Sequence, residues 1–388
     1  MLFNSVEFFV FLPLVFALYW LLRNQLKAQN LLVLIASYCF YGFWDWRFLS
    51  LIILSSFVDF FIGKAVHQAE GMSKKKRLLW VSLLVNLGIL FMFKYFDFFV
   101  GSFVEMANRV GVSANWTSLN WILPIGISFY TFQTLSYTID IYKERMKPTD
   151  SILDFFVYVA FFPQLVAGPI ERAVNLLPQF GVKRTFNYTQ AVDGSRQLLW
   201  GLFKKVVIAD NCAVYVDAIY NNQADLYGPI LLLGGILFIM QIYCDFSGYS
   251  DAAIGSARLL GFELKQNFAN PYFSTNSTEF WRRWHISMST WFRDYVYQPL
   301  GAGMAGLEEG RYVLGYFCDF HHNRHLARCQ LDLCGLWCFS GRCSYDGDMD
   351  SEKEKKIQEK EEVLKAVLWR KLVIDHVLLG ISMYNIQV

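Results

Sequence analysis

Apolar stretches separated by short polar or basic segments run along most of this chain. They cover about residues 6–22, 31–43, 48–62, 78–100, 121–141, 153–166, 197–209 and 229–243. Several are shorter than the roughly 20 residues that a straight helix needs to cross a bilayer. Some helices must therefore be tilted, broken or re-entrant, which is tolerated only where protein or a water-filled cavity surrounds the exposed backbone. The pattern predicts an all-α, multi-spanning membrane protein with a polar interior.

The composition supports this class and argues against others. Of the 388 residues, 55% are hydrophobic and only 18% are charged, which is too apolar for an ordinary soluble domain. The net charge is +2, and the basic residues are scattered between apolar stretches instead of forming one stripe. We therefore expect the lipid bilayer as a partner and no nucleic acid.

Basic residues alternate between the connecting segments. Arg23 and Lys27 follow the first apolar stretch, Lys64 and the SKKKR cluster at 73–77 lie between the third and the fourth, and three more basic residues follow the fifth. Because basic loops stay in the cytoplasm, we expect the N-terminus outside. We interpret the 73–77 cluster as a topology signal, with recognition of lipid headgroups as the alternative.

Residues 278–301, TEFWRRWHISMSTWFRDYVYQPLG, combine aromatic and basic residues. The aromatic residues and His285 recur at spacings of three and four, which predicts one helix with an aromatic face that carries an imidazole. The arginines suit a helix near a membrane interface. By periodicity alone, a packed, hydrogen-bonded histidine is favoured over a catalytic one.

Two other segments depart from ordinary spans. Residues 161–172, FFPQLVAGPIER, interrupt an apolar stretch with two prolines and a glycine, so we expect a kink or a re-entrant loop. Residues 241–264 place Asp245 and Asp251 in an apolar context. Charges at membrane depth are costly, so these carboxylates line a cavity or pair with a partner such as Arg258, or else they lie at a helix end in the interface.

Six blocks of sequence carry a family resemblance. They are FNSVEFFVFLPLVFALYWLL, LPIGISFYTFQTLSYTIDIY, LVAGPIER, CDFSGYSDAAIGSARLLGF, FWRRWHIS and WFRDYVYQPLG. In order and spacing, from residue 1 to about 301, the chain resembles the membrane-bound O-acyltransferase (MBOAT) family. The bacterial branch that contains alginate O-acetylase is the most similar.

The resemblance implies a ring-like body of helices with re-entrant segments and a central tunnel, in the bacterial inner membrane. Members of this branch transfer an acetyl group from a cytoplasmic donor, such as acetyl-CoA or another acyl thioester, to a hydroxyl of an exported polysaccharide such as alginate. A periplasmic partner protein often takes part. No cofactor is expected to remain bound.

The same resemblance marks His285 as the candidate catalytic residue. For this histidine, a hydrogen bond that positions the acceptor is favoured over a role as general base. The residues expected to line the tunnel or position substrate are Gln164, Gly168, Pro169, Asp245, Ser247, Tyr249, Asp251, Trp281, Arg282, Arg283, Trp284, Ser287, Arg293 and Asp294.

One family element is missing. A second histidine, in a Trp-His-Gly element some forty residues after the first, is usually assigned as catalytic, and no Trp-His-Gly follows His285. The corresponding segment, 315–341, holds four cysteines and three histidines instead. Their spacing matches no common zinc pattern, so we predict no metal site.

A change of reading frame between about Gly301 and Gly315 accounts for this segment. When each codon is read one base late, Leu326, Ala327 and Arg328 with the next codon permit Trp-His-Gly, within some seventeen residues that resemble the family. We therefore divide the chain into a membrane domain (1–300), an out-of-frame segment (301–344) and a charged tail with a weakly apolar end (345–388).

Three functions remain open at this stage. The favoured one is an acyltransferase fold whose chain lacks its catalytic histidine and is inactive. The second is an active enzyme that relies on His285 or on a substitute among His321, His322 and His325. The third is a non-catalytic membrane scaffold or a transporter that uses its buried carboxylates as a solute path.

Overall fold

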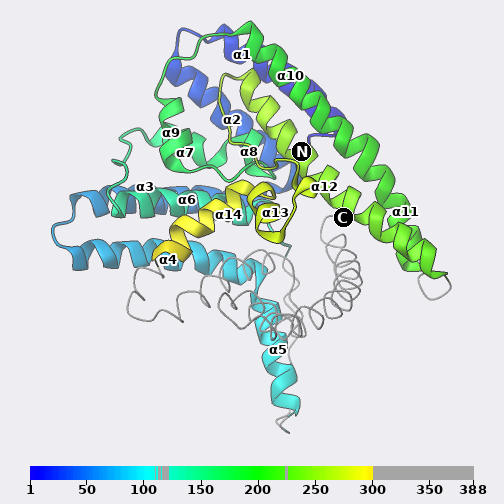
Figure 1. Cartoon of the computed structure of the whole chain (residues 1–388). Helices are drawn as coiled ribbons and strands as arrows, with labels where there is room; N and C mark the ends of the chain where they lie inside the picture. Colours follow the sequence, from blue (N-terminus) through cyan, green and yellow to red (C-terminus); the bar gives the residue numbers. More distant parts are fainter. Residues whose placement is uncertain (110, 112–114, 116–121, 223–225, 300–388) are drawn as a thin grey trace, which may run out of the picture. The chain divides into compact units, whose positions relative to one another are not determined.

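The structure, a computed structural model, describes residues 1–109, 111, 115, 122–222 and 226–299. The described residues form helices joined by turns and short loops, with no strand (Figure 1). The helices are α1 (Val6–Leu21), α2 (Leu26–Asp45), η1 (Trp46–Phe48), α3 (Leu49–Gln68), α4 (Met72–Lys94), α5 (Phe96–Arg109), α6 (Ile127–Tyr142), α7 (Ile152–Ala160), α8 (Phe162–Leu165), α9 (Ala173–Phe180), α10 (Tyr188–Leu202), η2 (Phe203–Ala209), α11 (Asp210–Asn221), α12 (Gly228–Leu259), η4 (Pro271–Phe273), α13 (Ser277–Arg283), α14 (Ile286–Phe292) and η5 (Arg293–Tyr297).

The all-α prediction is confirmed, although several bounds differ from the apolar stretches. Residues 78–100 are divided between α4 and α5, and the stretch at 229–243 continues as a single 32-residue helix, α12, through the polar segment after it. Within the described part of the chain, three segments are long and apolar enough to cross a membrane: Leu26–Gln68, Met72–Lys94 and Gly228–Leu259. The apolar helices Val6–Leu21 and Ile152–Leu165 are shorter, as expected for a body in which not every helix is a straight span.

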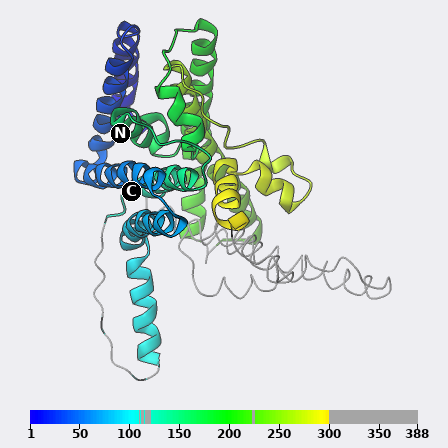
Figure 2. The same cartoon turned by 90° about the vertical axis from the view of Figure 1, so that its left-hand side faces the viewer.

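The helices fall into two compact units. The first contains Met1–Leu202 and Ser247–Ala269, and the second contains the described residues of Phe203–Phe246 and of 270–299. In the first unit α3, α4 and α6 pack side by side (Figures 1 and 2), and α7 packs against α2, α3 and α9. The core of this unit is rich in fully buried aromatic side chains, among them Tyr137, Phe155 and Phe162.

A buried carboxylate joins α3, α4 and α6. Asp59 on α3 is fully buried and accepts hydrogen bonds from Ser82 Oγ at 2.5 Å, Asn86 Nδ2 at 2.7 Å and Thr138 Oγ1 at 3.0 Å. The Ser55 hydroxyl then donates to Asn86 Oδ1 at 2.6 Å. Since a buried polar group is stable only when hydrogen-bonded, this network fixes the three helices in one register.

Small residues bring α10 and α12 into backbone contact in the first unit. A Cβ atom on Gly255 of α12 would lie 2.6 Å from the carbonyl oxygen of Gly194 on α10, and one on Gly201 would lie 2.5 Å from the carbonyl oxygen of Gly248. Glycines of this kind allow membrane helices to approach closely and to pack by van der Waals contact.

Replacing Gly255 with alanine should therefore destabilise the protein by about 1–3 kcal/mol, because the new methyl group forces two backbones apart. The matched control is Gly88→Ala on α4, where a Cβ would meet nothing within 4 Å. That change should be neutral or slightly stabilising, since alanine favours helix over glycine by about 0.5–1 kcal/mol. Thermal unfolding of the two variants in detergent micelles tests the difference, and equal stability would show that α10 and α12 are not in such close contact.

Candidate active site

The segment around His285 is two helices and not one. α13 ends at Arg283, Trp284 is extended (φ −100°, ψ 127°), and His285 has a left-handed backbone (φ 44°, ψ 53°) before α14 begins at Ile286. The predicted continuous helix over 278–301 is therefore wrong. A left-handed conformation costs a non-glycine residue about 1–2 kcal/mol, so packing by the surrounding residues must stabilise this break.

Aromatic stacking in the second unit provides that packing. The Trp284 ring is stacked on Phe280, with centroids 5.5 Å apart and planes at 16°, and it also contacts Tyr243. The His285 imidazole meets Phe246 edge to face, with centroids 4.8 Å apart. The histidine is only 6% exposed, and burial lowers the pKa of its imidazole. A neutral ring can accept a proton from one group or donate a hydrogen bond to another.

On the basic face predicted for this segment, the contacts of α13 are mainly with residues of the same helix or just before it. Asn276 Oδ1 accepts from Glu279 N at 2.8 Å and caps α13, while the Glu279 carboxylate accepts from Thr275 N and pairs with Arg283 at 2.5 Å. Hydrogen bonds from Thr275 hold the pKa of the Glu279 carboxyl below its usual value. Arg282 is exposed, and no ion pair joins it to a carboxylate of the described chain.

The remaining candidates of this segment lie on both sides of the break. Trp281 is half-buried and packs edge to face on Phe280, with centroids 5.3 Å apart. Ser287 is buried in the first turn of α14. Asp294, also buried, accepts from Nε of its neighbour Arg293 at 2.8 Å in the π-helical turn η5.

The carboxylates of α12 have partners other than Arg258, and neither lies at the helix end. Asp245 forms an ion pair with Lys205 of η2 at 2.6 Å, and the same lysine reaches Asp210 at 2.8 Å. In the first unit Asp251 Oδ1 accepts from Gln197 Nε2 of α10 at 2.8 Å. The predicted pairing with a basic partner is confirmed for Asp245, although that partner is Lys205 and not Arg258, and the alternative position at a helix end is wrong.

The other predicted residues of α12 also belong to the first unit. Ser247 is buried, and the half-buried Tyr249 ring packs on Phe3 with centroids 6.0 Å apart. Their positions follow from α12 continuing without a break through the segment predicted to be unusual.

The interruption at 161–172 is confirmed. α7 stops at Ala160, the single turn α8 follows, and Gly168 N donates to the Gln164 carbonyl at 3.0 Å, so that a Cβ on Gly168 would lie 2.5 Å from Gln164 Cα. Buried Gln164 donates to Gln133 Oε1 of α6 at 3.0 Å, and its own Oε1 has no partner among the described residues. Pro169, also buried, completes the turn.

The predicted site residues therefore form two groups, one in each unit. The first unit holds Gln164, Gly168, Pro169, Ser247, Tyr249 and Asp251, and the second holds Asp245, Trp281, Arg282, Arg283, Trp284, His285, Ser287, Arg293 and Asp294. Sequence reasoning missed Lys205, Phe246 and Gln133 as their contacts. Only Lys205 gave a signal, because it is a lysine within the apolar stretch 197–209.

Metal ligation finds no support in the part of the chain that the structure describes, where no three His, Cys, Asp or Glu side chains converge. The Cys/His segment 315–341 and the proposed change of frame lie outside the described residues, as do the domains 301–344 and 345–388.

A sequence model of MBOAT, the membrane-bound O-acyltransferase family, matches residues 38–315, which is well over half of the 388 residues. The chain belongs to this family. The matched region contains His285, the break between α13 and α14, and the interrupted segment at 161–172. The resemblance inferred from the sequence blocks is confirmed.

Several relatives of this MBOAT chain are named as acyltransferases. A probable alginate O-acetylase of Pseudomonas syringae pv. tomato is 42% identical over 304 residues, which cover 78% of this chain and 58% of the relative. A peptidoglycan O-acetyltransferase of Helicobacter pylori is 35% identical over 331 residues, covering 78% and 62%. A teichoic acid D-alanyltransferase of Bacillus subtilis is 28% identical over 186 residues, covering 46% of each chain. The match thus spans less than two thirds of the length of these relatives.

Proposed function

We propose that this MBOAT protein belongs to an O-acetyl transfer system, in which an acetyl group moves from a cytoplasmic thioester such as acetyl-CoA to hydroxyls of an exported polysaccharide. Two relatives with at least 35% identity are named as O-acetylating enzymes of alginate and of peptidoglycan. The structural observation that carries the proposal is the buried His285, held at a left-handed break between α13 and α14.

The chemistry assigns two tasks to the protein. The acceptor oxygen attacks the thioester carbonyl carbon, a C–O bond forms, the C–S bond breaks, and the acceptor proton ends on the thiolate that leaves. His285 is suited to hold the acceptor hydroxyl by a hydrogen bond, because burial keeps its imidazole neutral. Removal of the proton requires a general base, a contribution of about 10²- to 10⁴-fold in rate.

In our proposal the base is the Trp-His-Gly histidine, which the printed reading frame does not encode. The chain as printed is then inactive, and a single inserted or deleted base between the codons of about Gly301 and Gly315 restores the element. The end of the family match at residue 315 supports this placement.

Location and partners follow from the same proposal. The protein lies in the bacterial inner membrane with its N-terminus outside, which the alternation of basic segments supports. The acetyl group reaches the polysaccharide with the help of a periplasmic partner protein.

Two experiments test these proposals separately. Resequencing the codons of Leu300 to Tyr345 shows whether one base restores the Trp-His-Gly run. The gene as given and the frame-restored gene are then expressed in a bacterium that lacks its own polysaccharide O-acetylase but retains the periplasmic partner. Base-labile acetate on the polysaccharide is measured. The amount of each expressed protein in the membrane is the control.

We expect ester only with the restored gene. Acetylation by the printed gene would overturn the proposed frame change and leave the function standing. A restored protein that inserts into the membrane at normal levels and acetylates neither alginate nor peptidoglycan would overturn the proposed function.

A further inference from the structure

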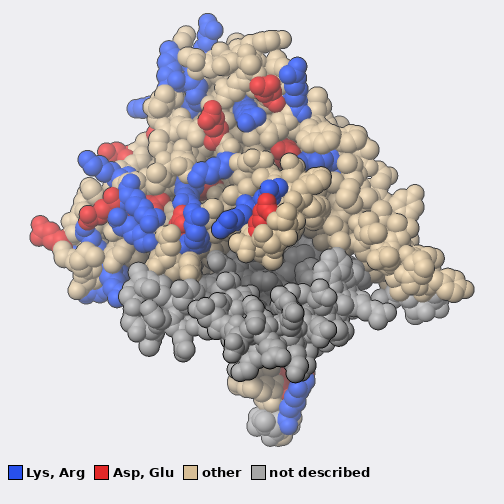
Figure 3. Space-filling model, in the orientation of Figure 1, with Lys and Arg blue, Asp and Glu red and all other residues tan. Residues whose placement is uncertain are grey.

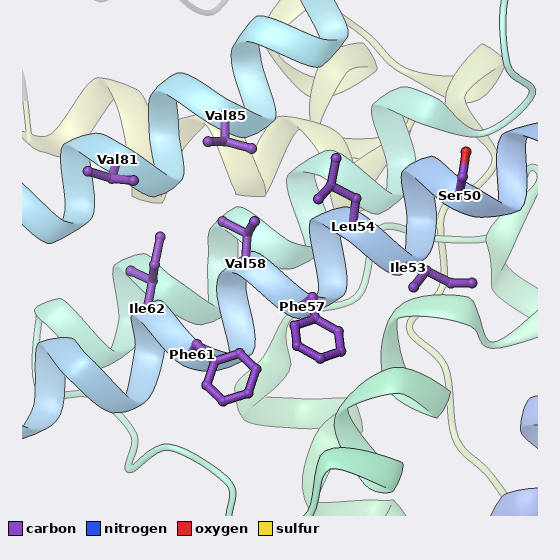
Figure 4. Close-up of a pocket in the computed structure, with 9 residues that line it drawn as sticks. All are labelled: Ser50, Ile53, Leu54, Phe57, Val58, Phe61, Ile62, Val81 and Val85. Atoms are coloured by element: carbon purple, nitrogen blue, oxygen red, sulfur yellow. The ribbon is translucent and has the colours of Figure 1, made fainter.

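An apolar groove runs along the surface of α3 and α4 in the first unit (Figure 4). It is shallow and open, with a volume of about 720 Å³, and Ser50 is the one polar residue among those that line it. Phe57 and Phe61 are about half exposed, and their rings lie side by side with centroids 5.1 Å apart. The remaining lining residues are Ile53, Leu54, Val58, Ile62, Val81 and Val85.

The groove has about the length of one lipid tail. From Ser50 to Ile62 on α3 the lining residues extend over about 18 Å, at 1.5 Å per helical residue. One leaflet of a bilayer with a hydrocarbon core of ~30 Å is about 15 Å thick. α3 and α4 also belong to two of the three segments long and apolar enough to cross a membrane.

Basic side chains continue the α4 face of the groove at one end. Arg77, Val81 and Val85 recur every four residues on α4, and Lys74 lies one turn before Arg77, so all four share one helix face. On α3, Lys64 lies one turn beyond Phe61, but its Nζ is directed over the buried Phe60 ring, 4.6 Å from the ring centroid. The turn at 69–71 joins these ends of the two helices. On the side of the molecule where Figure 1 places α3 and α4, Figure 3 shows many Lys and Arg side chains with some Asp and Glu among them.

Part of the positive charge at this end of the groove has no carboxylate partner among the described residues. Lys75 pairs with Glu144 at 2.9 Å, and Lys64 lies 3.6 Å from the fully exposed Asp150. Lys74, Lys76 and Arg77 form no ion pair with a described carboxylate, and Glu70 is the sole acidic residue between 64 and 77. A topology signal requires only the number of positive charges in the loop. The placement of Lys74 and Arg77 on the groove face is an additional feature.

We propose that the α3–α4 groove binds an anionic glycerophospholipid, with one acyl chain along the apolar residues and the phosphate beside Arg77 and Lys74. Charge complementarity selects an anionic headgroup, since these cations have too few carboxylate partners. The apolar lining selects a lipid over a soluble phosphate. This site is independent of the proposed acyl transfer.

Native mass spectrometry of the full chain, released from detergent and titrated with phosphatidylglycerol or phosphatidylcholine, tests the proposal. We expect tighter binding of phosphatidylglycerol, and Arg77→Gln should weaken it about five-fold, as fits the loss of one basic residue near an anionic surface. The matched control is Lys76→Gln, which removes the same charge from the same cluster but lies about 140° around α4 from Val81, and it should change binding less than two-fold.

The acyl chain is tested by filling the groove. Val81→Phe should displace bound lipid, whereas Leu87→Phe, at an equally exposed position about 120° around the helix, should not. Equal effects of Arg77→Gln and Lys76→Gln, equal binding of the two lipids, or unchanged binding by Val81→Phe would each overturn the proposal. Competition by soluble glycerol phosphate would overturn the role of the acyl chain.

Discussion

Replacing His285 with alanine in the frame-restored protein should lower acetyl transfer by about 10²- to 10⁴-fold, while the protein still inserts in the membrane. The imidazole is buried against Phe246 at the break between α13 and α14. Its loss removes the hydrogen bond proposed to hold the acceptor hydroxyl, and misplacement of a reacting group by about 1 Å can cost 10²-fold. Initial rates in isolated membranes, with an acyl thioester as donor, measure the effect.

A second substitution at this position separates positioning from proton transfer. Asparagine tolerates the left-handed backbone of residue 285 better than most residues, so His285→Asn should fold at least as well as the alanine variant. Its amide can still donate a hydrogen bond but cannot serve as a base. Partial activity in the asparagine variant, with a raised KM for the acceptor, supports positioning. Activity as low as in His285→Ala assigns the base to His285, and full activity in the alanine variant would contradict both roles.

Replacing Asp59 with alanine should destabilise the protein by about 3–5 kcal/mol. The Ser82 hydroxyl, the Asn86 amide and the Thr138 hydroxyl would all lose an acceptor at a site from which water is excluded. Each buried donor left without a partner costs about 1–3 kcal/mol. Because the three donors come from α4 and α6, the loss would loosen the packing of these helices against α3. Unfolding of the purified protein in detergent micelles measures the change.

Ser55→Ala is the matched control for that network. Asn86 Oδ1 keeps Thr134 Oγ1 as a donor at 3.3 Å when the Ser55 hydroxyl is removed, so the cost should stay near 1 kcal/mol. If Asp59→Ala were no less stable than Ser55→Ala, the carboxylate would not be the element that fixes these helices.

Local features of the sequence were sufficient for the class of fold and for some of its breaks. Apolar stretches of 13 to 23 residues predict membrane helices whatever their packing, since the cost of exposing backbone polar groups to lipid depends on the segment alone. The interruption near Gln164 also followed from sequence, because Pro163 and the tight turn at Gly168 restrict the backbone locally. The MBOAT family followed from the sequence blocks.

The site near His285 could not be derived in the same way. Spacings of three and four at 278–301 satisfy a continuous helix, and nothing in periodicity indicates that His285 adopts φ 44°. That conformation depends on rings distant in sequence, Phe246 and Tyr243, which pack on each side of the break. The partner of Asp245 was missed for the same reason, since Lys205 lies forty residues away in sequence.

The sequence by itself determined an α-helical membrane protein of the MBOAT family and the position of its candidate histidine. Only the tertiary structure decided that this histidine lies at a break between two helices, and that Asp59 is enclosed by donors from α4 and α6. Apolar periodicity indicates which residues of a segment are buried, but not which other segments cover them. Backbone strain and buried hydrogen bonds depend on which side chains from other segments reach them, and this information exists only after the helices have packed.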